Sequence, residues 1–431
     1  MPGLDLAMLP AKFLVCFLAL LGHLAFWVAV HNRLHAIGWH RRLVRATKNM
    51  ALLIMVGPLA VILGWTAASG DLFADPLAIL DQSAWVQAYF WLCFGTAVPA
   101  IVSWCWRGYT SNRAYLASCK QRTVHVGRQL GFSPCGNLPT RLLVGLPGNQ
   151  AVQLEVNEKV VVVPRLPGAL DGLTIAHLSD LHFTGRLSRE FFEFVVEQTN
   201  ELKPDLVAIT GDIIDKEKCL PWIGDVLGRL RAKSGVFCVF GNHERRIPDA
   251  SLLAGTFEDA GLTYLGGRWI EVQVRDRTVV LAGNELPWFR PAADMTTCPK
   301  VLHERRLPRV LLSHSPDQIQ WARAHDFDLM LAGHMHGGQI RFPVIGPIVG
   351  PSFYGVRYSG GVYYVKPTLL HVSRGVSGVQ TIRIHCRPEL TKLVLRPLGV
   401  EAATEESRAI DTRTAGLPVP ARLCRTGEDN V

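Results

Sequence analysis

A short apolar stretch that ends in a carboxylate and an imidazole is the feature that most constrains how this chain can fold. Residues 175–178 are apolar apart from His177, and Asp180 and His182 follow two positions apart. Side chains two apart on extended backbone point the same way, so both can bind one cation. A buried strand ending this way places them at its carboxyl edge, where open α/β sheets keep their ligands. The stretch therefore predicts an α/β fold with a metal site at a sheet edge.

The same kind of ending recurs along the chain. Alone, a Gly-Asp pair is usually a turn and a single His is usually a satisfied polar residue, but five pieces in one region favour a shared site. Carboxylate and amide oxygens mixed with imidazoles suit Mn, Fe, Zn or Co better than Ca, which prefers oxygen alone. The five pieces are Asp180-Leu181-His182, Gly211-Asp212-Ile213-Ile214-Asp215, Gly241-Asn242-His243-Glu244, Ser313-His314 and Gly333-His334-Met335-His336.

These motifs, in this order, resemble the calcineurin-like metallophosphoesterase superfamily over residues 150–395. Two further stretches are similar to its bacterial membrane-associated branch: Gly-Gly-Gln-Ile-Arg-Phe-Pro at residues 337–343, and Pro-Arg-Leu-Pro at residues 164–167. The fold that this resemblance implies is an α/β one, a two-sheet β-sandwich flanked by helices.

The resemblance also implies two divalent metal ions side by side. Asp212 would bridge them, because one carboxylate can give an oxygen to each cation. Two such ions polarise a phosphoryl group and activate water for in-line attack. His243 is expected to protonate the leaving oxygen, with orientation of the site as its alternative role. One ion would be held by Asp180, His182, Asp212 and His336, and the other by Asp212, Asn242, His314 and His334.

Neighbours of the motifs are further candidates. Asp215 is expected to hydrogen-bond a ligand histidine rather than bind metal, and Glu244 to stiffen its loop. Arg245 could clamp a phosphate bidentately together with the next arginine, although adjacent arginines are more often a solvated turn. Gln339 and Arg341 are expected to reach the substrate.

The first 110 residues predict a membrane domain. Three apolar runs, at residues 13–30, 50–68 and 84–106, each have about the length of a membrane-crossing helix. Buried core helices of a soluble protein are the alternative. Five Lys or Arg residues lie between the first two runs, none between the second and third, and five more follow the third. Because positive loops stay in the cytoplasm, we expect a multi-pass integral membrane protein with its amino terminus outside and its large carboxyl-terminal part inside.

The remaining segments differ in composition. Residues 111–149 predict a basic connector with prolines and glycines, residues 150–398 the phosphoesterase domain, and residues 399–431 a disordered tail. Ten cysteines without a Cys-x-x-Cys pair indicate reduced thiols. The net charge of +9 is explained by the loops beside the apolar runs, so we expect membrane lipids rather than nucleic acid as partners.

The function expected is hydrolysis of a phosphoester or pyrophosphate bond, in a lipid-linked substrate at the cytoplasmic face. One alternative is a phosphodiesterase for soluble nucleotides, with the spans as a simple anchor. Another is a protein Ser/Thr phosphatase, which Gly-Asn-His-Glu favours, although Lys216-Glu217 stands where that branch carries Arg-Gly. A third is a non-catalytic scaffold, which the complete ligand set disfavours.

Overall fold

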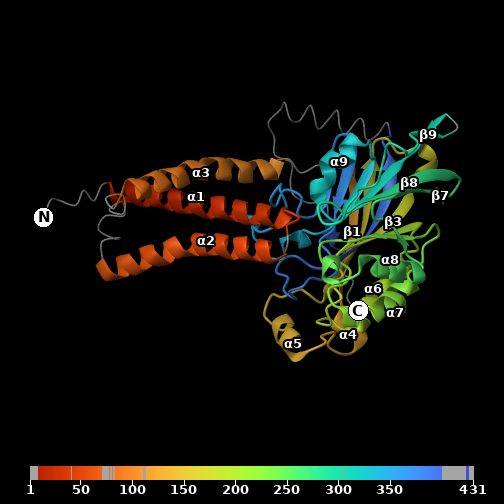
Figure 1. The fold of residues 1–431 in the computed structure, drawn as a ribbon, viewed down its shortest axis with the longest axis horizontal. Coiled ribbons are helices and arrows are strands. Elements are labelled where there is room, and N and C mark those ends of the chain that lie inside the picture. Colours follow the sequence, from red (N-terminus) through yellow and green to blue (C-terminus); the bar gives the residue numbers. More distant parts are fainter. Residues whose placement is uncertain are drawn as a thin grey trace. The chain divides into compact units, whose positions relative to one another are not determined.

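The computed structural model (Figure 1) describes residues 8–39, 41–69, 77, 80, 83–109, 113–302, 304–399 and 424–426. The chain divides into two compact units. The helical unit comprises Met1–Ser111 with Pro351–Arg357, and the sheet unit comprises Asn112–Gly350 with Tyr358–Val431.

The helical unit consists of α1 (Leu9–Ala36), α2 (Arg41–Ser69) and α3 (Ala84–Tyr109). Polar contacts connect the helices: the ring of His23 in α1 lies 2.6 Å from the Tyr89 hydroxyl of α3 and 2.9 Å from the Met55 carbonyl of α2. At Gly22 a side chain would lie 1.7 Å from the Cys93 carbonyl oxygen, so α1 and α3 approach closely there. Small residues and interhelical hydrogen bonds are what hold helices together where no hydrophobic force acts between them.

Two helices among the described residues are long and apolar enough to cross a membrane. They are Leu9–Leu34, of which 17% is buried, and Ala84–Cys105, of which 11% is buried. The third expected span, residues 50–68, lies within α2, but α2 is not one of these two candidates, and the side chains of residues 61–69 are outside the description. Two of the three expected spans are therefore candidates among the described residues.

The sheet unit contains two large sheets. The first has eight strands in the order β18-β1-β2-β17-β3-β4-β5-β6, and the second has six in the order β15-β16-β12-β11-β8-β7. The strands of the first are β1 (Leu116–His125), β2 (Gln153–Val163), β3 (Leu173–Leu178), β4 (Leu206–Thr210), β5 (Val236–Val239), β6 (Thr263–Tyr264), β17 (Glu389–Pro397) and β18 (Cys424–Thr426). Those of the second are β7 (Trp269–Val274), β8 (Arg277–Asn284), β11 (Arg309–Ser313), β12 (Leu329–Ala332), β15 (Gly361–Val365) and β16 (Thr368–Val372). Two small hairpins are β9 (Val301–Leu302) with β10 (Arg305–Arg306), and β13 (Arg341–Phe342) with β14 (Gly346–Pro347).

The two sheets pack face to face on an apolar core. Ile175 of β3 and Phe237 of β5 lie in one cluster with Leu281 of β8 and Leu312 of β11. A second cluster packs helices on the other face of the first sheet, with Phe192 of α6 among its members. Strands buried on both faces read as continuous apolar runs, as β4 does. The expected sandwich flanked by helices is confirmed. The helices are α4 (Val126–Leu130), α5 (Leu138–Val144), α6 (Arg189–Glu201), α7 (Pro221–Val226), α8 (Ala250–Asp259) and α9 (Ile319–Ala324).

The segment 111–149, expected as a connector, contributes instead to the sheet unit. β1 pairs antiparallel with β2 from Leu116 to His125, and α4 and α5 follow it. Val126 is fully buried. In the expected tail, Cys424–Thr426 pairs with β1 as β18, while residues 400–423 and 427–431 lie outside the described residues.

Candidate metal centre

The polar motifs of the sequence follow strands that run parallel within both sheets. β3, β4 and β5 are parallel neighbours in the first sheet, and β11 and β12 are parallel neighbours in the second. Their carboxyl ends therefore lie at common edges. The residues that follow these ends are Asp180 and His182, Asp212 and Asp215, Asn242 and His243, His314, and His334 and His336.

Five of these residues have backbone φ angles in the left-handed region. Their φ angles are +54° at Asp180, +50° at His182, +51° at Asp212, +68° at His334 and +47° at His336. Non-glycine residues rarely adopt this conformation, which persists only where surrounding structure imposes it and which gathers at functional sites. The chain thus bends sharply at each strand end and turns these side chains toward one another.

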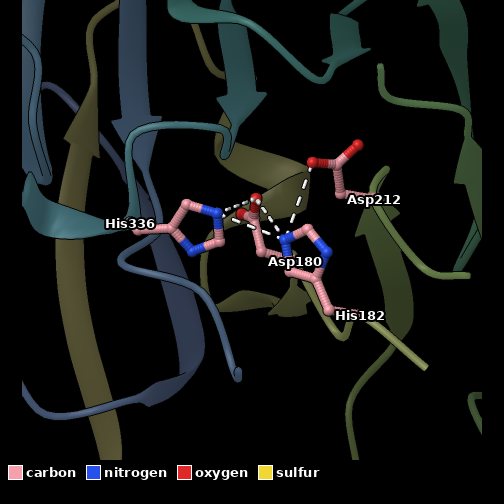
Figure 2. Close-up of side chains that lie close together, drawn as sticks. All are labelled: Asp180, His182, Asp212 and His336. Carbon is pink, nitrogen blue, oxygen red and sulfur yellow. Dashed lines mark hydrogen bonds and ion pairs between the residues drawn. The ribbon is translucent and has the colours of Figure 1, made fainter. Parts of the chain in front are cut away.

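The first group of candidate ligands is Asp180, His182, Asp212 and His336, whose donor atoms all lie within 4.8 Å of one another. In Figure 2 the four side chains converge. The Nε2 atoms of His182 and His336 are 3.2 Å apart, and His336 Nε2 lies 3.4 Å from Asp180 Oδ1. His182 Nε2 lies 3.6 Å from Asp212 Oδ2. These are the four residues predicted to hold one ion.

The second group is Asp212, His314 and His334. His314 Nε2 lies 3.3 Å from Asp212 Oδ2 and 3.0 Å from His334 Nδ1. The other ring nitrogen of His314 donates to the Thr210 carbonyl at 2.7 Å, which fixes the tautomer with Nε2 toward the group. Asp212 belongs to both groups, as a bridging carboxylate must. The structure brings the predicted residues together; that they bind metal remains a prediction.

Two observations show that these residues fit metal ions. Among the described residues, the buried Oδ1 atom of Asn242 has no hydrogen-bond partner, a costly state that a bound cation would relieve. Burial also lowers the pKa of His336 to about 3 and that of His334 well below its usual value, so both rings are neutral and offer lone pairs. Carboxylate, imidazole and amide donors together suit a divalent transition metal.

Asp215 connects the first group to His243. Its Oδ2 atom accepts from His182 Nδ1 at 2.7 Å, which confirms the predicted hydrogen bond to a candidate ligand. Its Oδ1 atom contacts His243 Nδ1 and Arg246 Nη1. The Nε2 atom of His243 is thereby turned toward the centre, 3.8 Å from Asp212 Oδ2.

Glu244 organises the loops beneath the centre. Its carboxylate accepts from the backbone N–H groups of Asp212, Ile213, Ile214 and Gly241. Burial and the neighbouring Asp212 raise the pKa of Glu244 to about 7, while these four donors favour the charged form. The predicted stiffening role is confirmed, because one side chain joins the loops after β4 and β5.

The predicted substrate residues lie near the centre in different ways. Gln339 directly follows the last motif, and its N–H donates to the His336 carbonyl at 3.0 Å. Arg341 begins β13. Arg245 is half-buried in the turn Glu244–Arg246, whereas its neighbour Arg246 contacts both Asp215 and His243.

Two residues at the centre were not predicted. The indole of Trp288 packs against the His334 and His314 rings, with centroids 4.8 and 5.5 Å away. Arg383 is fully buried and donates to the carbonyls of His336 and Arg374. Trp288 comes shortly after the end of β8, so its place near a strand end could have been predicted from the sequence. No sequence pattern predicts the burial of Arg383, because an arginine in a loop is normally solvated.

Comparison with known proteins agrees with this geometry. Residues 173–338 match the family described as calcineurin-like phosphoesterase. The phosphodiesterase YaeI of Escherichia coli is 32% identical over 225 residues, which cover 51% of this chain and 81% of YaeI. The uncharacterized metallophosphoesterase YkuE of Bacillus subtilis is 29% identical, over 56% of this chain and 86% of YkuE. A bovine protein named transmembrane protein with metallophosphoesterase domain is 29% identical, over 62% of this chain and 64% of its own.

The match to YaeI covers 81% of that protein. The family match at residues 173–338 spans the strands and loops that carry the two groups. The chain belongs to the calcineurin-like metallophosphoesterases, a family of dinuclear metal-dependent phosphoric ester hydrolases.

Proposed function

We propose that this hydrolase is anchored in a membrane and cleaves a phosphodiester or pyrophosphate bond of a lipid-linked substrate at the cytoplasmic face. The observation that carries the proposal is the presence, in one chain, of the metal centre and of two long apolar helices that are little buried. An anchored active site meets membrane lipids at a high local concentration.

The chain's own residues have defined tasks in this reaction. Asp180, His182, Asp212 and His336 would hold one metal ion, and Asp212, Asn242, His314 and His334 the other. When bound, the two ions supply Lewis acidity to the phosphoryl group and lower the pKa of the attacking water.

His243 serves as the proton donor to the leaving oxygen. Asp215 holds its Nδ1 atom, so Nε2 is the ring nitrogen that faces the centre and would deliver the proton. Arg246 Nη2 lies 3.2 Å from that Nε2 atom, where a guanidinium can also contact a phosphate oxygen. Asp215 is thus a positioning residue for both His182 and His243.

The cytoplasmic orientation needs three crossings, so the proposal includes α2 as a span beside the two candidates α1 and α3. The loop charges support this orientation. Basic residues flank α1 and α3 on the side predicted to be inside, and three Asp residues occupy the loop predicted to be outside. Arg113 lies just beyond α3, and Lys120 and Arg122 lie in β1. Each basic residue near an anionic leaflet contributes about 1 kcal/mol of attraction. The bovine relative is also named as a transmembrane protein.

Removing the spans tests the proposal. A chain that starts at Arg113 keeps β1, whereas one that starts near Asn149 would lose an entire strand of the first sheet. We expect the Arg113 chain to hydrolyse a small chromogenic phosphodiester at the rate of the full chain. On bilayer-embedded phospholipids and nucleotide-linked lipids it should be slower by about tenfold or more, because the local concentration is lost. Equal rates on embedded lipid would contradict the proposal and favour the soluble-nucleotide alternative.

A further inference from the structure

α5 presents leucines to solvent on one side and packs on the other. Its buried Thr140 and its packed Val144 face the core, while Leu138 and Leu142, one helical turn apart, are 64% and 66% exposed. Leu146 in the following turn is 49% exposed. Leucines that remain exposed to water add no hydrophobic stabilisation to the fold.

The hairpin formed by β13 and β14 shows the same feature. Phe342 in β13 is 48% exposed and Val344, at the tip of the hairpin, is 91% exposed. Val349, two residues after β14, is 48% exposed. The only charged residue between His336 and Gly350 is Arg341. The hairpin begins immediately after the His336-Gly337-Gly338-Gln339 segment of the metal centre.

The two elements are fastened to the same short segment, Thr381 to Ile384. Asn149, which follows α5, donates to the Thr381 carbonyl at 2.9 Å and accepts from Arg383 N–H at 2.9 Å. Arg341 N–H donates to the Ile384 carbonyl at 3.0 Å. Arg383 also donates to the His336 carbonyl. The leucines and the hairpin are therefore both tied to one segment that contacts the metal centre.

Charge in both regions has one sign. The sequence contains no Asp or Glu from residue 82 to 154 or from residue 329 to 388, whereas Arg128, Arg141 and Arg341 lie within or beside the two elements. Apolar side chains with basic neighbours and no acidic ones match an anionic bilayer, whose head groups attract cations above an apolar interior.

We propose that Leu138, Leu142, Leu146, Phe342, Val344 and Val349, here called the apolar rim, contact an anionic phospholipid bilayer and hold the metal centre at its surface. The proposal rests on the membrane anchoring proposed above. It adds a second attachment, within the sheet unit itself, that brings lipid head groups to the centre.

Photocrosslinking of the full chain tests this contact. Benzoylphenylalanine replaces Phe342 or Leu142 in protein reconstituted into vesicles of phosphatidylcholine and phosphatidylglycerol. The matched control replaces Leu252 of α8, which is 67% exposed but lies outside the rim. After irradiation, mass spectrometry should find phospholipid adducts at positions 342 and 142, at least about tenfold above position 252, because a buried apolar side chain favours lipid by roughly that factor.

Lipid adducts absent at both rim positions, present at only one of them, or equally abundant at Leu252 would each overturn the apolar rim. Equal yields in vesicles of phosphatidylcholine alone would overturn its preference for anionic lipid. The readout needs no turnover. If phospholipid adducts form at the rim positions but the chain does not hydrolyse phosphodiesters, only the proposed function is refuted. If the chain hydrolyses phosphodiesters but forms no phospholipid adducts, only the apolar rim is refuted.

Discussion

The helical unit and the sheet unit place their apolar side chains in opposite surroundings. In the helical unit Phe17, Leu53 and Trp85 are 60%, 71% and 86% exposed. In the sheet unit, β3 and β4 are buried along almost their whole length. Both regions are rich in the same residue types, so composition alone does not separate them.

The difference teaches that the two units require different solvents. Apolar surface in the sheet unit leaves water by packing on other strands and helices, which is the usual driving force of folding. The helices of the other unit bury little and are held by contacts such as His23 with Tyr89. On the membrane anchoring proposed above, their apolar surface leaves water by entering a bilayer. Three changes, one in the metal centre, one compared across the units and one in the sheet-unit interior, test this comparison.

Asp212→Asn should have the largest effect and should act on the sheet unit alone. Asp212 belongs to both candidate metal groups, so loss of its charge weakens both. We expect metal content to fall and hydrolysis of a chromogenic phosphodiester to drop about a thousandfold, which corresponds to about 4 kcal/mol. Elemental analysis and initial rates measure the two quantities.

The matched control is Asp225→Asn, which alters an exposed ion pair with Arg189 on the same unit and should change neither quantity. Both variants should stay in the membrane fraction. Full activity of Asp212→Asn with two ions bound would contradict its bridging role.

A Leu→Asp change should be costly in one unit and nearly free in the other. Leu20 of α1 and Leu252 of α8 are both exposed. If α1 spans a bilayer, Leu20→Asp should reduce membrane insertion by about 3 kcal/mol, or roughly a hundredfold, in a translocon insertion assay. Leu252→Asp, on a water-exposed helix, should change the free energy of unfolding by less than about 0.5 kcal/mol. Normal insertion of Leu20→Asp would place α1 outside the bilayer.

The smallest expected effect is a pH dependence confined to the sheet unit. Burial lowers the pKa of His177 to about 3, and its ring contacts His371 at 2.8 Å. Because the folded pKa lies below the unfolded value of about 6.5, the unfolded chain binds more protons below that pH, and stability falls as pH falls. Between pH 7 and 5.5 this contribution amounts to about 1 kcal/mol.

Urea unfolding of the chain that starts at Arg113, at these two pH values, measures this loss. In His177→Gln the loss should shrink by about 1 kcal/mol. The remaining loss would come from the other buried histidines with a lowered pKa, His371, His334 and His336. An identical loss in the variant would show that His177 does not titrate on unfolding.

Sequence alone determined those features that have a local physical cause. An apolar strand that ends in Asp or His carries its own signal, and the candidate ligands could be predicted for this reason. Asp249 accepts from Ser251 and Leu252 N–H at the start of α8, as a capping residue should. The two candidate spans were recognisable from length and lack of charge.

Other features were decided only by the tertiary structure. β17 lies between β2 and β3 although more than two hundred residues separate it from either, and the segment expected to be a connector forms β1 at the side of the same sheet. Strand pairing depends on a partner distant in sequence, so no local pattern encodes it. The burial of Arg383, the contact of Trp288 with two histidines and the joining of α5 to the β13–β14 hairpin have the same origin. Each depends on which segments the fold brings together, because burial and hydrogen bonding are properties of the packed chain and not of its neighbours in sequence.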